Sequence, residues 1–198
     1  MLRALLIASM TRSLPDWPAD FIVGIDRGAL FCVQNRISMD IAIGDFDSVS
    51  ETELESIRSN CKEIIRLDPV KDVTDTQAAL ELVASAEEIW LCGGLGGRID
   101  HQLINIGLVR SDLRMKLWDE QHLIYAVSGE KNIKKAGYRY LSLFAAQPSV
   151  VSLTGVKYPL TDRKIDLSDL YLVSNEILEE EAYFTVEGRV LVIQSNDA

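Results

Sequence analysis

Cysteine is scarce in this chain, which has three cysteines among its 198 residues. Cys32, Cys61 and Cys92 are scattered and form no Cys-x-x-Cys pair. An odd, sparse set of this kind argues against a disulfide framework and against a zinc site. We therefore expect reduced thiols and a cytoplasmic protein.

Positive charge is also in deficit, with 20 Lys and Arg against 30 Asp and Glu, a net charge of −10 and a pI of about 4.7. This balance argues against nucleic acid or an anionic membrane surface as a partner. No apolar run approaches the roughly 20 residues needed to cross a bilayer. The short apolar start, residues 2–10, carries Arg3 and lacks a convincing cleavage site, so we interpret it as a first strand and not a signal peptide.

Residues 1–120 alternate strand and helix patterns, which is typical of an α/β domain with a mostly parallel sheet. The predicted strands are 3–8, 21–25, 40–43, 63–67, 88–92 and 115–118. The predicted helices are 28–35, 51–60, 75–86 and 99–110. Capping boxes, Ser50 with Glu53 and Thr74 with Gln77, support the starts of two of these helices.

Residues 121–198 contain short strand patterns and no helix of comparable strength, so we expect a second, all-β domain. The predicted strands are 122–127, 138–146, 150–154, 170–173, 182–186 and 189–193. Glu187-Gly188 and Gly129-Glu130 are predicted to be tight hairpin turns.

The sequence Gly44-Asp45-Phe46-Asp47-Ser48 places two carboxylates one residue apart after an apolar strand. In an extended segment, Asp45 and Asp47 would point to the same side, where a cation would relieve their repulsion. The pattern therefore suggests a metal site. Asp-x-Asp-Ser is also good turn chemistry, and either acid could merely favour the positive end of the next helix.

Several predicted strands end in residues suited to a ligand site. These ends are Asp26-Arg27-Gly28, Asp68 with Lys71-Asp72 beyond it, and Gly93-Gly94, in addition to the acid pair. In a parallel sheet they share one edge, where α/β proteins bind ligands. Turns also favour Asp and Gly, which explains one or two such ends more easily than four.

A glycine-rich loop, Gly93-Gly94-Leu95-Gly96-Gly97, leads into Arg98-Ile99-Asp100-His101 and a predicted helix. Backbone amides and a helix N-terminus suit phosphate oxygens, and Arg98 adds a planar cation. The spacing is neither the dinucleotide fingerprint nor the Walker loop, and glycine-rich loops also occur as plain turns. Asp75, at the start of a helix on the same edge, could complete the ligand set of Mg²⁺.

Together these segments resemble the thiamine pyrophosphokinase family. The matching blocks are Asp26-Arg27-Gly28-Ala29, the Gly44–Ser48 block, Lys71-Asp72-Val73-Thr74-Asp75-Thr76, the Gly93–His101 block, Gly155-Val156-Lys157-Tyr158-Pro159-Leu160 and Ser174-Asn175-Glu176. The resemblance implies a Rossmann-like, three-layer α/β nucleotide domain at residues 1–120. It also implies an all-β sandwich at residues 121–198 that binds thiamine, and a homodimer.

By position, the resemblance implies that Asp45, Asp47 and Asp75 hold Mg²⁺ on the phosphates of ATP. The implied nucleotide site consists of Asp26, Arg27, Gly28, Lys71, Asp72, Thr74, Gly93, Gly94, Gly96, Gly97 and Arg98. Arg98, Asp100 and Asp75 are the expected catalytic residues, and Tyr158, Ser174 and Asn175 are expected to face thiamine.

Two positions depart from the family pattern. Arg27 stands where many members have glycine, and Lys71 stands where some have glutamine. Lys71 could neutralise phosphate charge there. Two other functions fit parts of the pattern: a sugar-nucleotide transferase using an Asp-x-Asp metal pair, and a non-catalytic sensor of nucleotide or thiamine.

Overall fold

The computed structural model describes residues 2–197, which divide into two compact units. The first unit contains residues 2–105 and 114–120, and the second contains residues 106–113 and 121–197. Helix α4 (Ile99–Ser111) therefore begins in the first unit and ends in the second. No helix among the described residues is long and apolar enough to cross a membrane.

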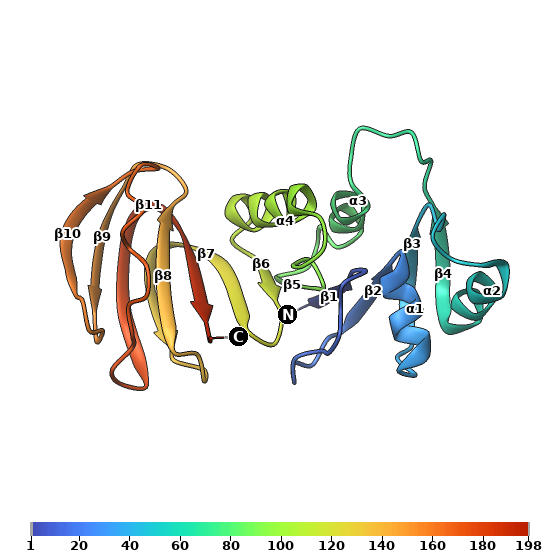
Figure 1. The fold of residues 1–198 in the computed structure, drawn as a ribbon, viewed down its shortest axis with the longest axis horizontal. Coiled ribbons are helices and arrows are strands. Elements are labelled where there is room, and N and C mark those ends of the chain that lie inside the picture. The colour runs from blue at the N-terminus through green and yellow to red at the C-terminus, as the bar shows by residue number, and fades with distance from the viewer. Residues whose placement is uncertain (1, 198) are drawn as a thin grey trace. The chain divides into compact units, whose positions relative to one another are not determined.

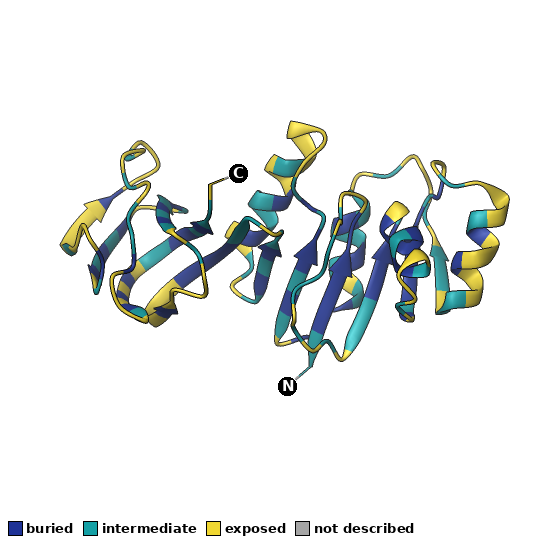
Figure 2. Ribbon diagram, turned by 60° about the horizontal axis from the view of Figure 1, so that its bottom comes forward, coloured by how far each residue is buried: buried dark blue, intermediate teal, exposed yellow. Residues whose placement is uncertain are grey.

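The first unit has a six-stranded sheet in the order β6-β5-β1-β2-β3-β4, in which every pairing is parallel (Figure 1). Its strands are β1 (Arg3–Ile7), β2 (Phe21–Ile25), β3 (Met39–Gly44), β4 (Cys61–Arg66), β5 (Glu88–Cys92) and β6 (Met115–Trp118). The central strands are largely buried, as expected for a sheet covered on both faces (Figure 2).

Helices cover both faces of this sheet. They are α1 (Arg27–Gln34), α2 (Glu51–Asn60) and α3 (Asp75–Leu82), with the start of α4. α1 and α2 share an apolar cluster that includes Leu30 and Ile57. The chain moves outward from β2 to β4 and then returns to β5, so right-handed crossovers place α3 on the opposite face (Figure 1). The predicted three-layer α/β architecture is confirmed.

Both predicted capping boxes are present, Ser50 with Glu53 and Thr74 with Gln77. The helix that starts after Thr74 is shorter than the predicted 75–86 and ends at Leu82. The amide of Val83 bonds to the carbonyl of Leu80, three residues back, so the last turn tightens there. All three cysteines are free, as expected, and Cys32 and Cys92 are buried.

Apart from the end of α4, the second unit is all-β and antiparallel. Its strands are β7 (His122–Lys134), β8 (Tyr140–Ala145), β9 (Ser149–Thr154), β10 (Leu160–Ile165) and β11 (Glu181–Ser195). The long strand β11 pairs with β9 through its first half and with β8 through its second, while β7 lies along both halves. One apolar core, which includes Leu153 and Phe184, fills the unit.

Three predictions for this unit are wrong. Glu187-Gly188 and Gly129-Glu130 are not hairpin turns, because they lie inside β11 and β7. Gly129 and Gly188 have positive φ angles of 75° and 107°, and the β7–β11 register shifts between Val186 and Val190. These glycines therefore form a bulge that bends two continuous strands.

Residues 170–173 are not a strand, although the amide of Leu143 bonds to the carbonyl of Leu172. The strand that the prediction missed is β10, whose central residues, Thr161 to Lys164, are polar and exposed. β10 pairs with β9 alone, and charged side chains are typical of such an edge strand.

Candidate functional site

A cavity of about 410 Å³ opens at the carboxyl edge of the parallel sheet in the first unit. It lies beyond the ends of β1 and β5, adjacent strands after which the chain turns in opposite directions. Such a switch point is the usual ligand site of an open α/β sheet. The lining residues are Ala8, Ser9, Met10, Ile25, Asp26, Thr74, Asp75, Thr76, Gly93, Gly94, Gly96, Gly97, Arg98, His101 and Asn105.

The glycine loop forms one wall of this cavity. Gly93, Gly96 and Gly97 have φ angles of 73°, 85° and 69°, which side chains with a β-carbon rarely allow. The buried Asn105 donates a hydrogen bond of 2.8 Å from Nδ2 to the carbonyl of Gly94. The loop is therefore anchored to α4 beside the cavity.

Two carboxylates, those of Asp26 and Asp75, also line this cavity. Asp26 follows β2 with a φ of 49°, and its Oδ1 is buried without a hydrogen-bond partner among the described residues. Burial, together with the nearby negative charges of Asp75 and Asp45, raises the pKa of Asp26 to about 7. A cation brought to these acids would relieve both the repulsion and the unsatisfied oxygen.

Lys71 neutralises part of this charge. Its Nζ lies 2.9 Å from Oδ1 of Asp75, and the two side chains are 17% and 25% exposed. The contact is an ion pair by distance, without the alignment of a hydrogen bond to that oxygen. The contact with Asp75, and then the negative charges of Asp45 and Asp26, raise the pKa of Lys71.

The prediction that Asp45 and Asp47 point to the same side of an extended segment is wrong. β3 ends at Gly44, and Phe46 has a φ of 58°, so the segment is not extended. Asp45 is half-buried and accepts a hydrogen bond of 3.1 Å from the backbone amide of Asp47, whose side chain is exposed. The two acids therefore do not stand side by side on one face of a strand.

No set of three His, Cys, Asp or Glu side chains within residues 2–197 is arranged as a metal-ligand cage. Magnesium rarely needs one, because it usually takes one or two carboxylates and fills its shell with phosphate oxygens and water. The crowded acids and the orphaned oxygen of Asp26 fit a cation of this kind.

Arg98 and Asp100 bond to each other at the mouth of the cavity. Arg98 Nε lies 3.1 Å from Asp100 Oδ1, and Nη2 reaches the other carboxylate oxygen. Both side chains are largely exposed. The hydrogen bond from Arg98 lowers the pKa of Asp100, so this carboxyl is ionised at neutral pH. The first turn of α4 thus presents a matched cation and anion.

Four of the residues expected in the nucleotide site are absent from the cavity wall: Lys71, which pairs with Asp75, and Arg27, Gly28 and Asp72. Arg27 donates a hydrogen bond of 3.1 Å to the carbonyl of Ser48 and so supports the acid loop. Gly28 is buried where an added Cβ would lie 1.9 Å from the carbonyl oxygen of Ile7, which indicates a packing role. Asp72 is exposed.

Ser9, Met10 and Asn105 line the cavity but were not among the predicted site residues. Ser9 and Met10 follow β1, which ends at the same edge as the strands that were used for the prediction. Applying that rule to every strand would have found them. Asn105 could not be found in this way, because only the fold brings it behind Gly94.

In the second unit, Tyr158, Ser174 and Asn175 lie close together. Asn175 Nδ2 donates to the carbonyl of Tyr158, and Oδ1 accepts from the amides of Tyr158 and Glu176, at 2.8–2.9 Å. Ser174 has a φ of 58°, and its amide bonds to Oγ of Ser142. The Asn175 amide thus clamps two loops together, while Tyr158 and Ser174 remain exposed.

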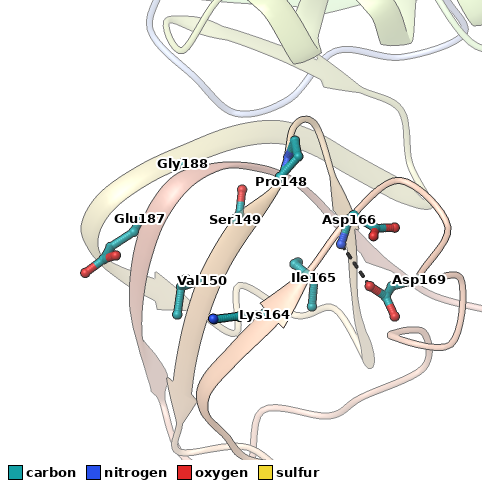
Figure 3. A pocket seen from close by; sticks show the side chains of 9 residues that line it. All are labelled: Pro148, Ser149, Val150, Lys164, Ile165, Asp166, Asp169, Glu187 and Gly188. Carbon is teal, nitrogen blue, oxygen red and sulfur yellow. Dashed lines mark hydrogen bonds between the residues drawn. The ribbon is translucent and has the colours of Figure 1, made fainter.

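A separate cavity of about 530 Å³ in the second unit involves none of these residues (Figure 3). It lies at the ends of β9 and β10, beside the bulge of β11, and the Lys164, Asp166 and Glu187 side chains line it. Asp169 also lines it and accepts a hydrogen bond of 2.8 Å from the amide of Asp166. Asp166 and Asp169 have hydrogen-bond partners within their own loop, so the predicted thiamine residues remain the better candidates for a ligand site.

Comparison with known proteins places both units in one family. Residues 17–122 match the thiamin pyrophosphokinase catalytic domain, and residues 130–191 match the thiamin pyrophosphokinase vitamin B1 binding domain. The thiamine pyrophosphokinase of Bacillus subtilis is 33% identical over 186 residues, which cover 88% of this chain and 87% of that protein.

Solved structures agree. A thiamin pyrophosphokinase family protein from Enterococcus faecalis superposes with a TM-score of 0.87 at 32% identity, covering 99% of this chain and 100% of that one. Thiamin pyrophosphokinase from Candida albicans shares the fold at 16% identity, with a TM-score of 0.82 over 98% of this chain and 89% of that one. The chain belongs to the thiamine pyrophosphokinase family.

Proposed function

We propose that this protein transfers a pyrophosphoryl group from ATP to the hydroxyl of thiamine, giving thiamine diphosphate and AMP. The observation that carries the proposal is the cavity of the first unit, where a glycine loop and a helix start face a cluster of aspartates. Phosphoryl-type transfer depends on positioning and charge stabilisation, and these groups supply both.

The glycine loop is the proposed cradle for the phosphates of ATP. Backbone amides of Gly93, Gly94, Gly96 and Gly97 and the N-terminus of α4 favour phosphate oxygens. Arg98 can make a bidentate contact with a phosphate, and to do so its guanidinium would leave Asp100. Asp26 and Thr74 line the same cleft.

Asp45, Asp47 and Asp75 are the proposed ligands of Mg²⁺. When bound, the ion would stabilise the negative charge of the polyphosphate. Asp75 and Asp45 already stand close to the orphaned oxygen of Asp26, which supports their assignment. Asp47 is exposed at the same loop, and its carboxylate would have to reach inward.

Asp100 is the proposed partner of the thiamine hydroxyl. Its pKa is lowered by Arg98, so it is an anion that can accept a hydrogen bond from the hydroxyl and orient the oxygen. If Asp100→Asn kept a normal kcat with unchanged ATP binding, this role would be excluded.

Tyr158, Ser174 and Asn175 are the proposed thiamine residues. The exposed Tyr158 ring and Ser174 hydroxyl would contact the substrate, and the Asn175 clamp would position both loops. We further propose a cytoplasmic homodimer without nucleic-acid or membrane partners, and a division of the chain into domains 1–120 and 121–198. The acidic net charge of −10 supports the absence of nucleic acid.

The deciding experiment measures AMP released from ATP with Mg²⁺, with and without thiamine. We expect AMP and thiamine diphosphate in equal amounts, and no AMP without thiamine. Turnover of a sugar nucleotide in a parallel assay would favour the transferase, and thiamine binding without turnover would favour the sensor. Full activity without added Mg²⁺, in the presence of a chelator, would contradict the metal assignment.

A further inference from the structure

The ion pair between Lys71 and Asp75 involves one of the three proposed metal ligands, Asp75. The two residues are four apart, on the loop before α3 and at its first position, and their charged atoms are 2.9 Å apart. Both side chains are largely shielded from water. Lys71 Nζ also donates a hydrogen bond of 3.2 Å to the carbonyl of Asp68, which holds the ammonium over the acids.

The surrounding charges make this ammonium a stand-in for a metal ion. Asp75 has the largest effect on Lys71, and the negative charges of Asp45 and Asp26 add to it. The nearby arginines have other partners, since Arg98 bonds to Asp100 and Arg27 to the carbonyl of Ser48. A divalent cation that uses Asp75 as a ligand must therefore displace Lys71.

We propose that Lys71 holds the cation position at Asp75 in the unliganded protein and moves to the triphosphate when metal and nucleotide bind. The inference rests on the proposed function, because it takes Asp75 as a metal ligand and the glycine loop as the phosphate site. The flexible four-carbon stem of lysine permits such an exchange. Lys71 is thus a positioning residue that couples the two ligands.

The exchange predicts cooperative binding. Metal alone must break the Lys71–Asp75 pair, whereas nucleotide offers the ammonium a new anionic partner. Each ligand should therefore raise the affinity for the other, by the same factor in both directions. Removing the ammonium should abolish most of that coupling.

The test uses Lys71→Gln, with Lys62→Gln as the matched control. Lys62 forms an ion pair of 2.7 Å with Asp40 at the start of β3, and neither residue belongs to the proposed site, so both variants lose one charge and one ion pair. Thermal melting checks that both variants fold. Mn²⁺, followed by the electron paramagnetic resonance signal of the free ion, serves as the metal probe without nucleotide. We expect Lys71→Gln to bind Mn²⁺ roughly three- to tenfold more tightly than wild type, and Lys62→Gln to match wild type.

The same titration is repeated with saturating α,β-methylene ATP, in which the bond broken by the proposed reaction is replaced. Here we expect wild type and Lys71→Gln to bind Mn²⁺ alike, and Lys71→Gln to bind the analogue more weakly. An equal gain in Mn²⁺ affinity with and without the analogue would indicate general charge repulsion and would overturn the exchange. Unchanged Mn²⁺ affinity in Lys71→Gln would also overturn it.

These measurements need neither thiamine nor turnover, so they separate the two proposals. If wild type binds Mn²⁺ and the analogue but the variant shows no change in coupling, the role of Lys71 fails and the proposed function stands. If wild type binds neither ligand, the proposed site fails, and the inference about Lys71 fails with it.

Discussion

At the scale of single residues, the aspartates of the first unit differ in their surroundings although the sequence makes them look alike. Asp26 is crowded by Asp75 and Asp45, whereas Asp47 is exposed and Asp100 is paired with Arg98. Burial and neighbours, and not residue type, decide which carboxyl needs a cation.

Substitution of the proposed metal ligands tests the metal assignment. Asp45→Ala, Asp47→Ala and Asp75→Ala should each lower kcat on the order of 10²–10⁴-fold, because charge stabilisation of the transition state is lost. Steady-state AMP production measures the effect, and the exposed Glu55→Gln in α2 serves as a control with normal activity. Wild-type rates for both Asp45→Ala and Asp75→Ala would remove the metal site from this edge of the sheet.

The side chain of Asn175 makes a second prediction at this scale. Asn175→Ala removes one donor and one acceptor bond to Tyr158 in the other loop, and one acceptor bond to the neighbouring Glu176. We therefore expect a loss of about 1–3 kcal/mol in the free energy of unfolding. Urea denaturation measures it. Asn132→Ala, which removes a single long contact of 3.5 Å to Glu181 on the surface, should change stability by less than 0.5 kcal/mol or so. Equal stability of the two variants would show that the clamp contributes nothing.

At the scale of elements, the strands of the first unit could be predicted closely from the sequence, and the candidate site only in part. Periodicity located β2 and β5 to the residue, because each is a short apolar run bounded by turn residues. Because the carboxyl ends of parallel strands share one edge of the sheet, the sequence then predicted that Asp26, Asp75 and the glycine loop are neighbours. The φ of 58° at Phe46 and the hydrogen bond from Asn105 to Gly94 depend on long-range packing, and no local pattern announces them.

The strands of the second unit were harder to predict, for a physical reason. Glycine in a strand pattern is ambiguous between a turn and a bulge, and only the pairing partner decides. Gly129 and Gly188 looked like turns, but β7 and β11 continue through them because each strand supports the other. The strand β10 has no alternating apolar pattern that would predict a strand, because only its last residue, Ile165, is buried.

Helix α1 yields a prediction about close packing. Gly28→Ala would place a methyl 1.9 Å from the carbonyl oxygen of Ile7 in β1, so we expect a loss of about 1–3 kcal/mol or more. Gly107→Ala in α4 meets nothing within 4 Å and should gain up to about 1 kcal/mol from helix propensity. Thermal unfolding of the two variants measures both. A neutral Gly28→Ala would mean that α1 is free to shift on its sheet.

The ion pair that joins β1 to the residue before β2 predicts a pH dependence. Arg3 donates three hydrogen bonds of 3.0 Å to the Asp20 carboxylate, and these lower the pKa of Asp20 to about 2. Because the folded-state pKa lies below the unfolded value of about 3.9, the pair stabilises the fold above that pH and loses its effect as the pH falls toward 2.

Asp20→Asn should therefore lower the melting temperature at pH 7, and the difference from wild type should shrink between pH 4 and pH 2. The pair is partly exposed, so the effect should be small and reduced by salt. Melting curves at pH 7, 4 and 3 measure it. A difference that is constant with pH would assign the effect to packing and not to charge.

At the scale of the whole molecule, the two units are not consecutive along the chain. Residues 106–113, the end of α4 and the turn after it, pack with the β unit, and β6 then returns to the first unit. Arg189 in β11 donates hydrogen bonds of 3.4 and 3.1 Å to the carbonyls of Arg110 and Ser111, which lie at the end of α4. These carbonyls have no partner within the helix, so Arg189 acts as its cap.

This arrangement predicts a local effect of Arg189→Ala. Amide hydrogen exchange should become faster in residues 106–113, while β1 and β5 of the first unit keep their protection. Arg163→Ala, which removes a bond of 2.9 Å to Tyr171 Oη on the surface of the same unit, is the control and should leave residues 106–113 unchanged. Equal exchange in both variants would show that the cap is dispensable.

The bulge in β11 has a consequence for how the length of this strand can vary. Glu187, Gly188 and Arg189 stand opposite Ser128 alone, and the core-facing alternation of Val186 resumes in phase at Val190. Losing one residue here would turn the following half of the strand inside out, whereas losing two would preserve which side chains meet the core. Natural insertions and deletions at this bend are therefore expected in pairs.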